Sequence, residues 1–139
     1  MRILCIVLLS VLLSALSLHA ADHAVVLVYN QVSSDTPSST SVTPEVFRRH
    51  LDYLNSEGFS VLPLSLVLKT LVKGEDVPDK TVSITFDDAY QSVFDQAMPM
   101  LKERNWPFTV FVNTQAIDRG YRNSLSWNKL RQLLGAGAE

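Results

Sequence analysis

Two adjacent carboxylates, Asp87 and Asp88, are the residues best suited to chemistry in this 139-residue sequence. They follow the β-rich segment 81–86, so we expect them at the C-terminal end of a strand. Catalytic and ligand-binding groups gather at that end of the strands in parallel α/β folds. One carboxylate could hold a metal ion while the other accepts a proton from bound water, whose pKa a metal lowers to about 7. A solvated acidic turn is the alternative interpretation.

The rest of the sequence alternates between β-rich and helix-periodic segments, a pattern that predicts a parallel sheet built from βαβ units. We expect strands at residues 24–29, 59–62, 81–86 and 108–112. We expect helices at residues 44–57, 65–73, 90–104 and 127–134. Pro99 interrupts the third helix and should bend it. Residues 136–139 are expected to approach another strand.

The first helix carries the clearest local signals. Thr43 can cap its N-terminus, and Pro44 suits its first position, where a backbone N–H is not needed. Apolar side chains then recur at helical spacing, which predicts one buried stripe of Phe47, Leu51 and Leu54.

The segment 85–90, Thr-Phe-Asp-Asp-Ala-Tyr, resembles the first motif of the polysaccharide deacetylases, carbohydrate esterase family 4, usually written T-F-D-D-G. Further segments resemble parts of this family in the same order along the chain. They are the opening strand at 28–32, the helix at 41–54, the strand at 106–112 and the segment at 124–127 before the second motif. The helix is most similar to that of members acting on poly-N-acetylglucosamine and related glycans. The resemblance spans residues 24–139.

The resemblance implies an α/β fold, a partial distorted (β/α) barrel of about four parallel strands with intervening helices, incomplete at the C-terminus. By position, Asp87 would be the catalytic base and Asp88 a ligand of a divalent metal, usually zinc in this family. The metal would polarise an acetamide carbonyl, and hydrolysis would release acetate and a free amine. The implied enzyme is a hydrolase of carbon–nitrogen bonds that removes N-acetyl groups from cell-envelope or exopolysaccharide glycans.

The sequence departs from the family pattern in three ways. Ala89 stands where Gly is usual, and Asn30 stands where a histidine usually follows Tyr29. The H-x-x-x-H motif that supplies the other two metal ligands in this family does not occur after the Asp pair. Within residues 21–139, His23 and His50 have no partner at ligand spacing and are expected to be ordinary surface residues. We therefore expect a truncated form that does not bind zinc tightly and is inactive by itself.

Tyr29, Asn30 and Asn113 are weaker candidates, expected to line a substrate site. Tyr29 and Asn113 lie at the ends of expected strands, where ligands bind in such sheets, although a turn-forming role is equally open. Trp106 and Trp127 could form a platform for a sugar ring, but we expect them to pack in the hydrophobic core.

Residues 1–20 have the layout of a secretory signal peptide, with a basic start, an apolar run and small residues around Ala20. The run is short for a stable membrane span, which needs about 20 apolar residues. We expect cleavage near Ala20 and export to the periplasm, the cell envelope or the medium. Residues 21–139 would then be the N-terminal portion of a deacetylase domain. That portion has no cysteine, because Cys5 is the only one in the sequence.

The net charge of −2, without any basic run, argues against nucleic acid as a partner. An acetylated polysaccharide is the expected partner. One alternative to the deacetylase is a non-catalytic glycan-binding or scaffolding remnant of the same fold. Another is a glycoside hydrolase with two carboxylates, for which Asp118 is the only candidate second acid. A chelator separates the two enzymes, since only the deacetylase should lose activity.

Overall fold

The computed structural model describes residues 20–139, and the expected signal peptide lies outside this range apart from Ala20. The first described strand, β1 (Ala20–Ala21), pairs antiparallel with β6 (Val77–Pro78). Between residues 20 and 139, no helix has both the length and the apolar character needed to cross a membrane.

The centre of the fold is a four-stranded parallel sheet organised around β7 (Thr81–Phe86). On one side, β2 (Val25–Tyr29) pairs with five consecutive residues of β7. On the other side, β5 (Ser60–Val61) pairs with the start of β7 and β8 (Thr109–Val110) with its end. The four expected parallel strands are confirmed, although β5 and β8 are shorter than expected. Among the described residues the sheet is open and closes no barrel.

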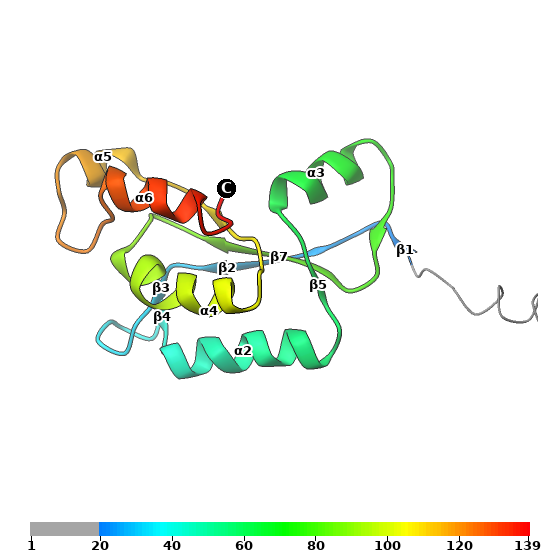
Figure 1. Ribbon diagram of the computed structural model, residues 1–139, viewed down its shortest axis with the longest axis horizontal. Helices are drawn as coiled ribbons and strands as arrows, with labels where there is room; N and C mark the ends of the chain where they lie inside the picture. The colour runs from blue at the N-terminus through cyan, green and yellow to red at the C-terminus, as the bar shows by residue number, and fades with distance from the viewer. Residues whose placement is uncertain (1–19) are drawn as a thin grey trace, which may run out of the picture.

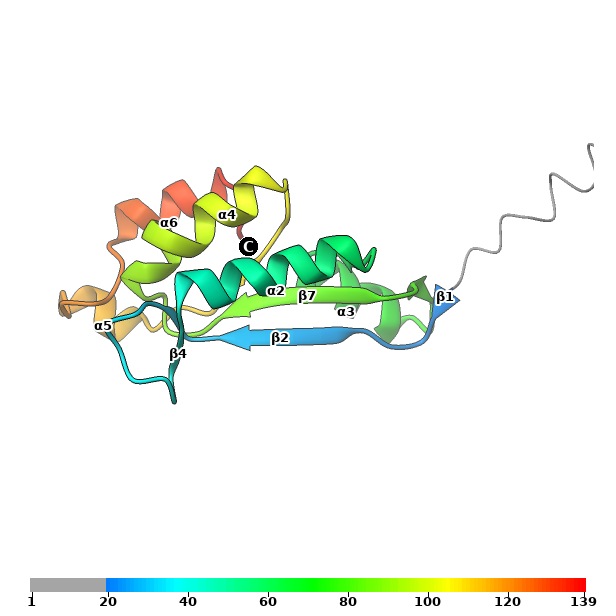
Figure 2. The same ribbon diagram turned by 90° about the horizontal axis from the view of Figure 1, so that it is seen from below.

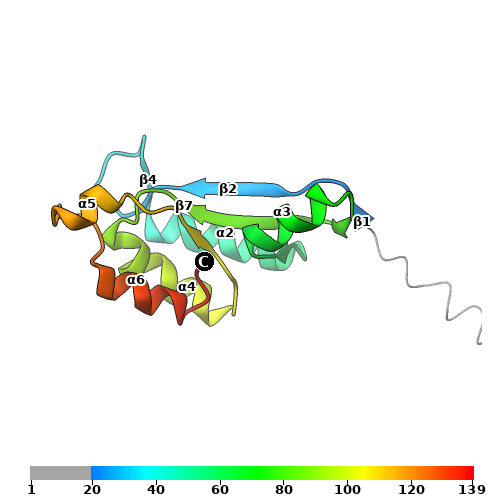
Figure 3. The same cartoon turned by 90° about the horizontal axis from the view of Figure 1, so that it is seen from above.

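Three helices cover one face of this sheet. Figure 2 shows α2 (Pro44–Ser56), α4 (Met98–Glu103) and α6 (Trp127–Leu134) on the same side of β2 and β7, and Figure 3 agrees. The helix α3 (Leu64–Val72) lies toward the β1 end of the molecule (Figure 1). Because helices and strands alternate along the chain, the βαβ organisation expected from the sequence is confirmed.

Two small features were not expected from the sequence. The strands β3 (Gln31–Val32) and β4 (Ser41–Val42) form a short parallel ladder that closes the Ser- and Thr-rich loop between them. A short helix, α5 (Thr114–Asp118), follows β8. Both features lie beyond the C-terminal ends of strands, the end where the sequence placed the candidate site.

The helix α2 forms as its sequence predicts. The Thr43 hydroxyl accepts a hydrogen bond of 3.2 Å from the backbone N–H of Val46, which caps the first turn. Phe47, Leu51 and Leu54 are all buried against the sheet, with at most 6% of their surface exposed. The apolar stripe therefore supplies the contact that fixes α2 on β2 and β7.

The helix expected at residues 90–104 is interrupted before Pro99, as predicted, but the interruption is a π-helical segment. This segment, η1 (Val93–Ala97), leads directly into α4, and the N–H of Met98 donates to the carbonyl of Val93. Pro99 lies in the first turn of α4. Because proline lacks an N–H and crowds the carbonyl four residues earlier, the wider π turn accommodates it without ending the helix.

Aromatic packing joins the sheet to α2. The Tyr29 ring lies edge-on to Phe47 at 5.1 Å and stacks on Phe86 at 5.7 Å, measured between ring centroids. Phe108 meets the other side of Phe86 edge-on at 6.0 Å. Phe47, Phe86 and Phe108 are essentially fully buried, so this cluster anchors the end of β7 that leads to the Asp pair.

The chain end pairs with β8. A parallel bridge joins Phe108 to Ala138, and the N–H of Glu139 donates a 2.9 Å hydrogen bond to the Phe108 carbonyl. Residues 138–139 therefore extend the parallel pairing of the sheet beyond β8. The contact falls on the edge of β8 that faces away from β7.

Candidate functional site

The Asp pair follows β7 directly, and the sheet positions its first member. The backbone N–H of Asp87 donates a 2.8 Å hydrogen bond to the carbonyl of Tyr29, so the ladder between β2 and β7 continues into the site. Because side chains alternate along a strand, the Asp87 side chain follows those of Ser83 and Thr85 on one face of β7. That series lies on the face opposite the helices, whereas Phe86 packs in the core. Asp87 is half-buried at the strand end.

The second member lies in a sharply turned backbone. Asp88 and Ala89 both have left-handed conformations, with φ angles of 65° and 51°. Such a conformation costs a non-glycine residue about 1–2 kcal/mol, and consecutive examples persist only where surrounding structure holds them. The turn takes Asp88 out of the strand geometry, which would otherwise direct neighbouring side chains to opposite faces. Strain of this kind is concentrated at functional sites.

A later segment of the chain holds the turn in place. The N–H of Leu125 donates to the carbonyl of Ala89 at 2.9 Å, and the N–H of Gln91 donates to the carbonyl of Asn123 at 2.7 Å. Tyr90 and Ser124 form an antiparallel bridge between these bonds. Sequence analysis missed this support, because backbone pairing across more than thirty residues leaves no local pattern to recognise.

Tyr29 contributes to the site through its backbone, while its ring belongs to the core. Its hydroxyl lies 3.0 Å from Nδ1 of His50, a residue that is exposed, as expected, on α2. Burial raises the pKa of Tyr29 to about 12, so the phenol is neutral at ordinary pH. The ring therefore lies on the helix face, with Phe86, and not on the face of the Asp87 series.

The two asparagine candidates lie beyond the ends of β2 and β8. Asn113 caps α5, with its side-chain oxygen accepting a 3.2 Å hydrogen bond from the N–H of Ala116. Asn30 follows Tyr29 and lines a small recess of about 170 Å³ beside the Ser-rich loop. Asn113 thus has the turn-forming role that the sequence left open. Within residues 20–139, neither asparagine is hydrogen-bonded to the Asp pair.

Asp118, the candidate second acid of a glycoside hydrolase, has a structural contact. One of its carboxylate oxygens accepts a 2.9 Å hydrogen bond from the indole N–H of Trp127. Trp127 itself is 44% exposed at the start of α6, so it is less buried than expected. Trp106 is partly buried against the core, as expected. The hydrogen bond between Asp118 and Trp127 links α5 to α6, which gives both side chains a structural role.

The described residues do not fit a complete zinc site. Catalytic zinc usually takes three protein ligands, and residues 20–139 contain no cluster of three His, Cys, Asp or Glu side chains. Asp87 and Asp88 are neighbours in one turn, and His50 is engaged with Tyr29 on the helix face. The turn can therefore offer carboxylate oxygens to a cation but cannot enclose one.

Comparison with known proteins finds similarity to one family. Residues 74–139 match the family model described as polysaccharide deacetylase. A poly-β-1,6-N-acetyl-D-glucosamine N-deacetylase of Staphylococcus epidermidis is 32% identical over 93 residues, covering 67% of this chain and 32% of that protein. A Bacillus subtilis protein named as a polysaccharide deacetylase is 27% identical over 112 residues, covering 81% of this chain and 39% of its own.

Solved structures give the same result for the fold. IcaB from Ammonifex degensii superposes with a TM-score of 0.76 at 29% identity, covering 86% of this chain and 52% of its own. The Streptococcus pyogenes deacetylase PplD, solved with acetate, gives 0.74 at 25% identity, covering 84% and 54%. Residues 74–139 therefore match the polysaccharide deacetylase family model as a partial domain, and the fold is similar to that of these deacetylases. The chain spans 39% and 32% of the lengths of the two curated relatives.

Proposed function

We propose that this chain carries the Asp-Asp part of the active site of a polysaccharide N-deacetylase that acts on a poly-N-acetylglucosamine type of glycan. The observation that carries the proposal is the Asp87–Asp88 pair at the C-terminal end of β7, where Asp88 and Ala89 form a left-handed turn, in a fold shared with deacetylases. The names of the relatives support the choice of substrate, because one of them is a poly-β-1,6-N-acetyl-D-glucosamine N-deacetylase.

The reaction needs one base. Asp87 accepts a proton from the attacking water as the water oxygen bonds to the acetamide carbonyl carbon. The carbon–nitrogen bond then breaks, the proton passes to the departing nitrogen, and the products are acetate and a free amine on the sugar. The half-buried position of Asp87 at the rim of the sheet suits this role, since a polymer can approach a rim and not a core.

A divalent metal, zinc by family resemblance, belongs to the proposal only as a requirement of the complete site. Asp88 is the residue of this chain that we assign as a ligand. Because the described residues assemble no set of three ligands, the 139-residue chain alone should hold zinc weakly, and we assign no reaction step to the metal.

The proposed setting is outside the cytoplasm. Residues 1–20 have the sequence of a signal peptide, and its removal would leave residues 21–139 as the portion that carries the deacetylase fold. An acetylated envelope glycan or exopolysaccharide would be available there. Secretion of the chain with a free N-terminus near Ala21, measured by N-terminal sequencing, would support this part of the proposal.

The test is acetate release from an oligomer of β-1,6-linked N-acetylglucosamine by this segment placed in a complete deacetylase domain. We expect Asp87→Asn to lower kcat about 10²–10⁴-fold, the usual contribution of a general base. The matched control is Asp76→Asn, an exposed acid outside the site. We also expect a chelator to abolish the release. Unchanged turnover in Asp87→Asn would overturn the proposal.

A further inference from the structure

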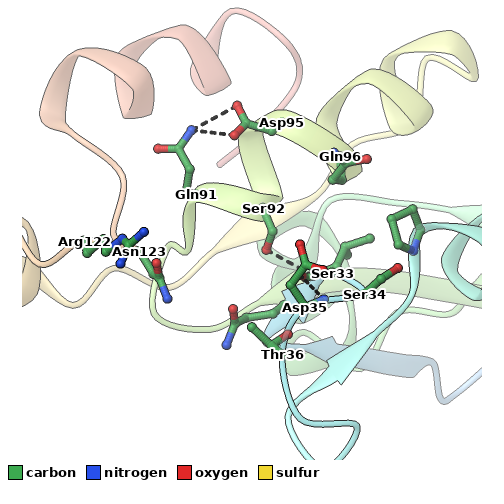
Figure 4. A pocket seen from close by; sticks show the side chains of 13 residues that line it. Ser33, Ser34, Asp35, Thr36, Gln91, Ser92, Asp95, Gln96, Arg122 and Asn123 are labelled. Carbon is green, nitrogen blue, oxygen red and sulfur yellow. Dashed lines mark hydrogen bonds between the residues drawn. The ribbon is translucent and has the colours of Figure 1, made fainter.

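A polar cleft of about 660 Å³ lies between the loop after β3 and the start of the helix that contains η1. Figure 4 shows Ser33, Ser34 and Asp35 on the loop side, with Gln91 and Asp95 on the helical side. The segment 122–123 forms another part of the wall. Neither Asp87 nor Asp88 lines the cleft, so it is distinct from the candidate catalytic turn.

Hydrogen bonds fix the floor of the cleft. The Ser92 hydroxyl accepts a 3.1 Å bond from the N–H of Val32, which joins helix to loop. The Gln91 side-chain amide donates to both carboxylate oxygens of Asp95 at 3.0 and 2.9 Å. The backbone of Gln91 also belongs to the pairing that holds the Asp88 turn. The cleft is therefore held together by hydrogen bonds, and the backbone of Gln91 connects it to the candidate site.

Several polar groups at the cleft have no partner within residues 20–139. The side chains of Gln96 and Asn123 are exposed and make no hydrogen bond there. The Thr36 hydroxyl oxygen is buried and unpaired among the same residues. A buried hydroxyl without a partner costs about 1–3 kcal/mol, so a small shift of the loop on ligand binding could recover free energy.

The chemistry of the lining selects a class of ligand. Amides and hydroxyls predominate, and the described lining residues include no aromatic ring. The lining carries Asp35 and Asp95 against a single cation, Arg122, which disfavours a phosphate or another anion. Asp95 is further engaged by Lys129 at 3.7 Å. An uncharged ligand with many hydroxyl and amide groups satisfies these donors and acceptors best, and the volume lies within the roughly 300–1,000 Å³ of ligand pockets.

We propose that this cleft is a second glycan-binding site. It holds a short stretch of N-acetylated saccharide, separate from the sugar unit that is deacetylated at Asp87 and Asp88. The choice of an N-acetylated sugar rests on the proposed function, whereas the choice of a neutral polyhydroxylated ligand rests on the lining alone. Such a site would hold one part of the glycan while another part reaches the Asp turn, because Gln91 belongs to both structures.

The experiment is a binding titration of the 139-residue chain with a hexamer of β-1,6-linked N-acetylglucosamine, followed by calorimetry. We compare the wild type with the double variant Gln96→Ala/Asn123→Ala, which removes two unpaired amides from the cleft. The matched control is Asn128→Ala/Gln132→Ala, which removes the same residue types from the exposed surface of α6. None of the four side chains makes a hydrogen bond within residues 20–139, so folding should be unaffected, and circular dichroism checks this.

We expect the cleft variant to weaken binding about tenfold or more, as the loss of two hydrogen bonds predicts, and the control to leave it unchanged. Equal affinity in the cleft variant, or no binding by the wild type, would overturn the proposal. Asp87→Asn should bind the hexamer normally. If Asp87→Asn also keeps full acetate release when the segment is placed in a complete deacetylase domain, while the cleft variant loses binding, the proposed function fails and the proposed glycan-binding site is retained.

Discussion

The backbone N–H of Asp87 donates to the carbonyl of Tyr29, which fixes the candidate base to the end of the neighbouring strand. The Tyr29 ring packs against Phe86, the residue before Asp87 and the partner of Tyr29 in the strand pairing. One aromatic cluster therefore holds both residues. The backbone of Asp87 is thus held in place by two strands and the core.

The backbone of Asp88 can be tested separately from its charge. We expect Asp88→Asn to keep the free energy of unfolding within about 0.5 kcal/mol, because asparagine tolerates the left-handed conformation at φ 65°. Asp88→Ala should lower it by about 1 kcal/mol more, since alanine does not. Urea denaturation measures both. An alanine variant as stable as the asparagine variant would show that the turn is not strained.

Ala89 gives a test of space at the same turn. It is fully buried with φ 51°, so Ala89→Gly loses a methyl contact of about 0.8 kcal/mol but removes a left-handed strain of similar size. We expect a net change within about 1 kcal/mol. Ala89→Val adds volume and β-branching there and should cost about 3 kcal/mol or more. Thermal unfolding that ranks valine above glycine would contradict the geometry.

The Tyr29 phenol makes stability depend on alkaline pH. Burial raises its pKa from 10.0 to about 12, so the folded state favours the neutral phenol. The stabilisation is complete below about pH 10 and is lost as the pH rises toward about 12. We expect the free energy of unfolding of the wild type to fall more steeply over this window than that of Tyr29→Phe. Parallel curves for the two proteins would contradict the burial of the hydroxyl.

Zinc affinity tests the incomplete ligand set. The 139-residue chain should bind zinc with a dissociation constant above about 1 μM, because Asp88 and its neighbour offer carboxylates alone. Asp88→Asn should weaken even this binding, whereas Asp76→Asn should not. Isothermal titration calorimetry gives the values. Nanomolar affinity in the wild-type chain would mean that the described residues converge on a metal after all.

Local patterns predicted the elements that depend on local causes. Thr43 caps α2, Phe47 begins its buried stripe, and the continuous apolar run of residues 24–29 became the parallel strand β2. Pro99 was recognised as an interruption, but its accommodation by a π turn depends on how η1 packs, which spacing does not reveal. The Asp pair was located correctly at the end of β7 from its strand alone.

Features made by distant backbone pairing were not predictable in this way. The hydrogen bonds that join Leu125 and Asn123 to the Asp turn involve main-chain atoms only. Side-chain identities therefore carry no signal for them. The hydrogen bond between Tyr29 and His50 joins strand and helix across 21 positions and also went unforeseen. The polar cleft arises for the same reason, since loop and helix meet only in the folded chain.

The central claim is that the carboxylates of Asp87 and Asp88 act together on an acetylated glycan. The direct measurement is the steady-state rate of acetate release by this segment in a complete deacetylase domain, compared between the wild type and Asp87→Ala/Asp88→Ala. Our account predicts a loss of about a thousandfold or more in kcat/KM, with the fold retained by circular dichroism. Wild-type turnover in the double variant would contradict it.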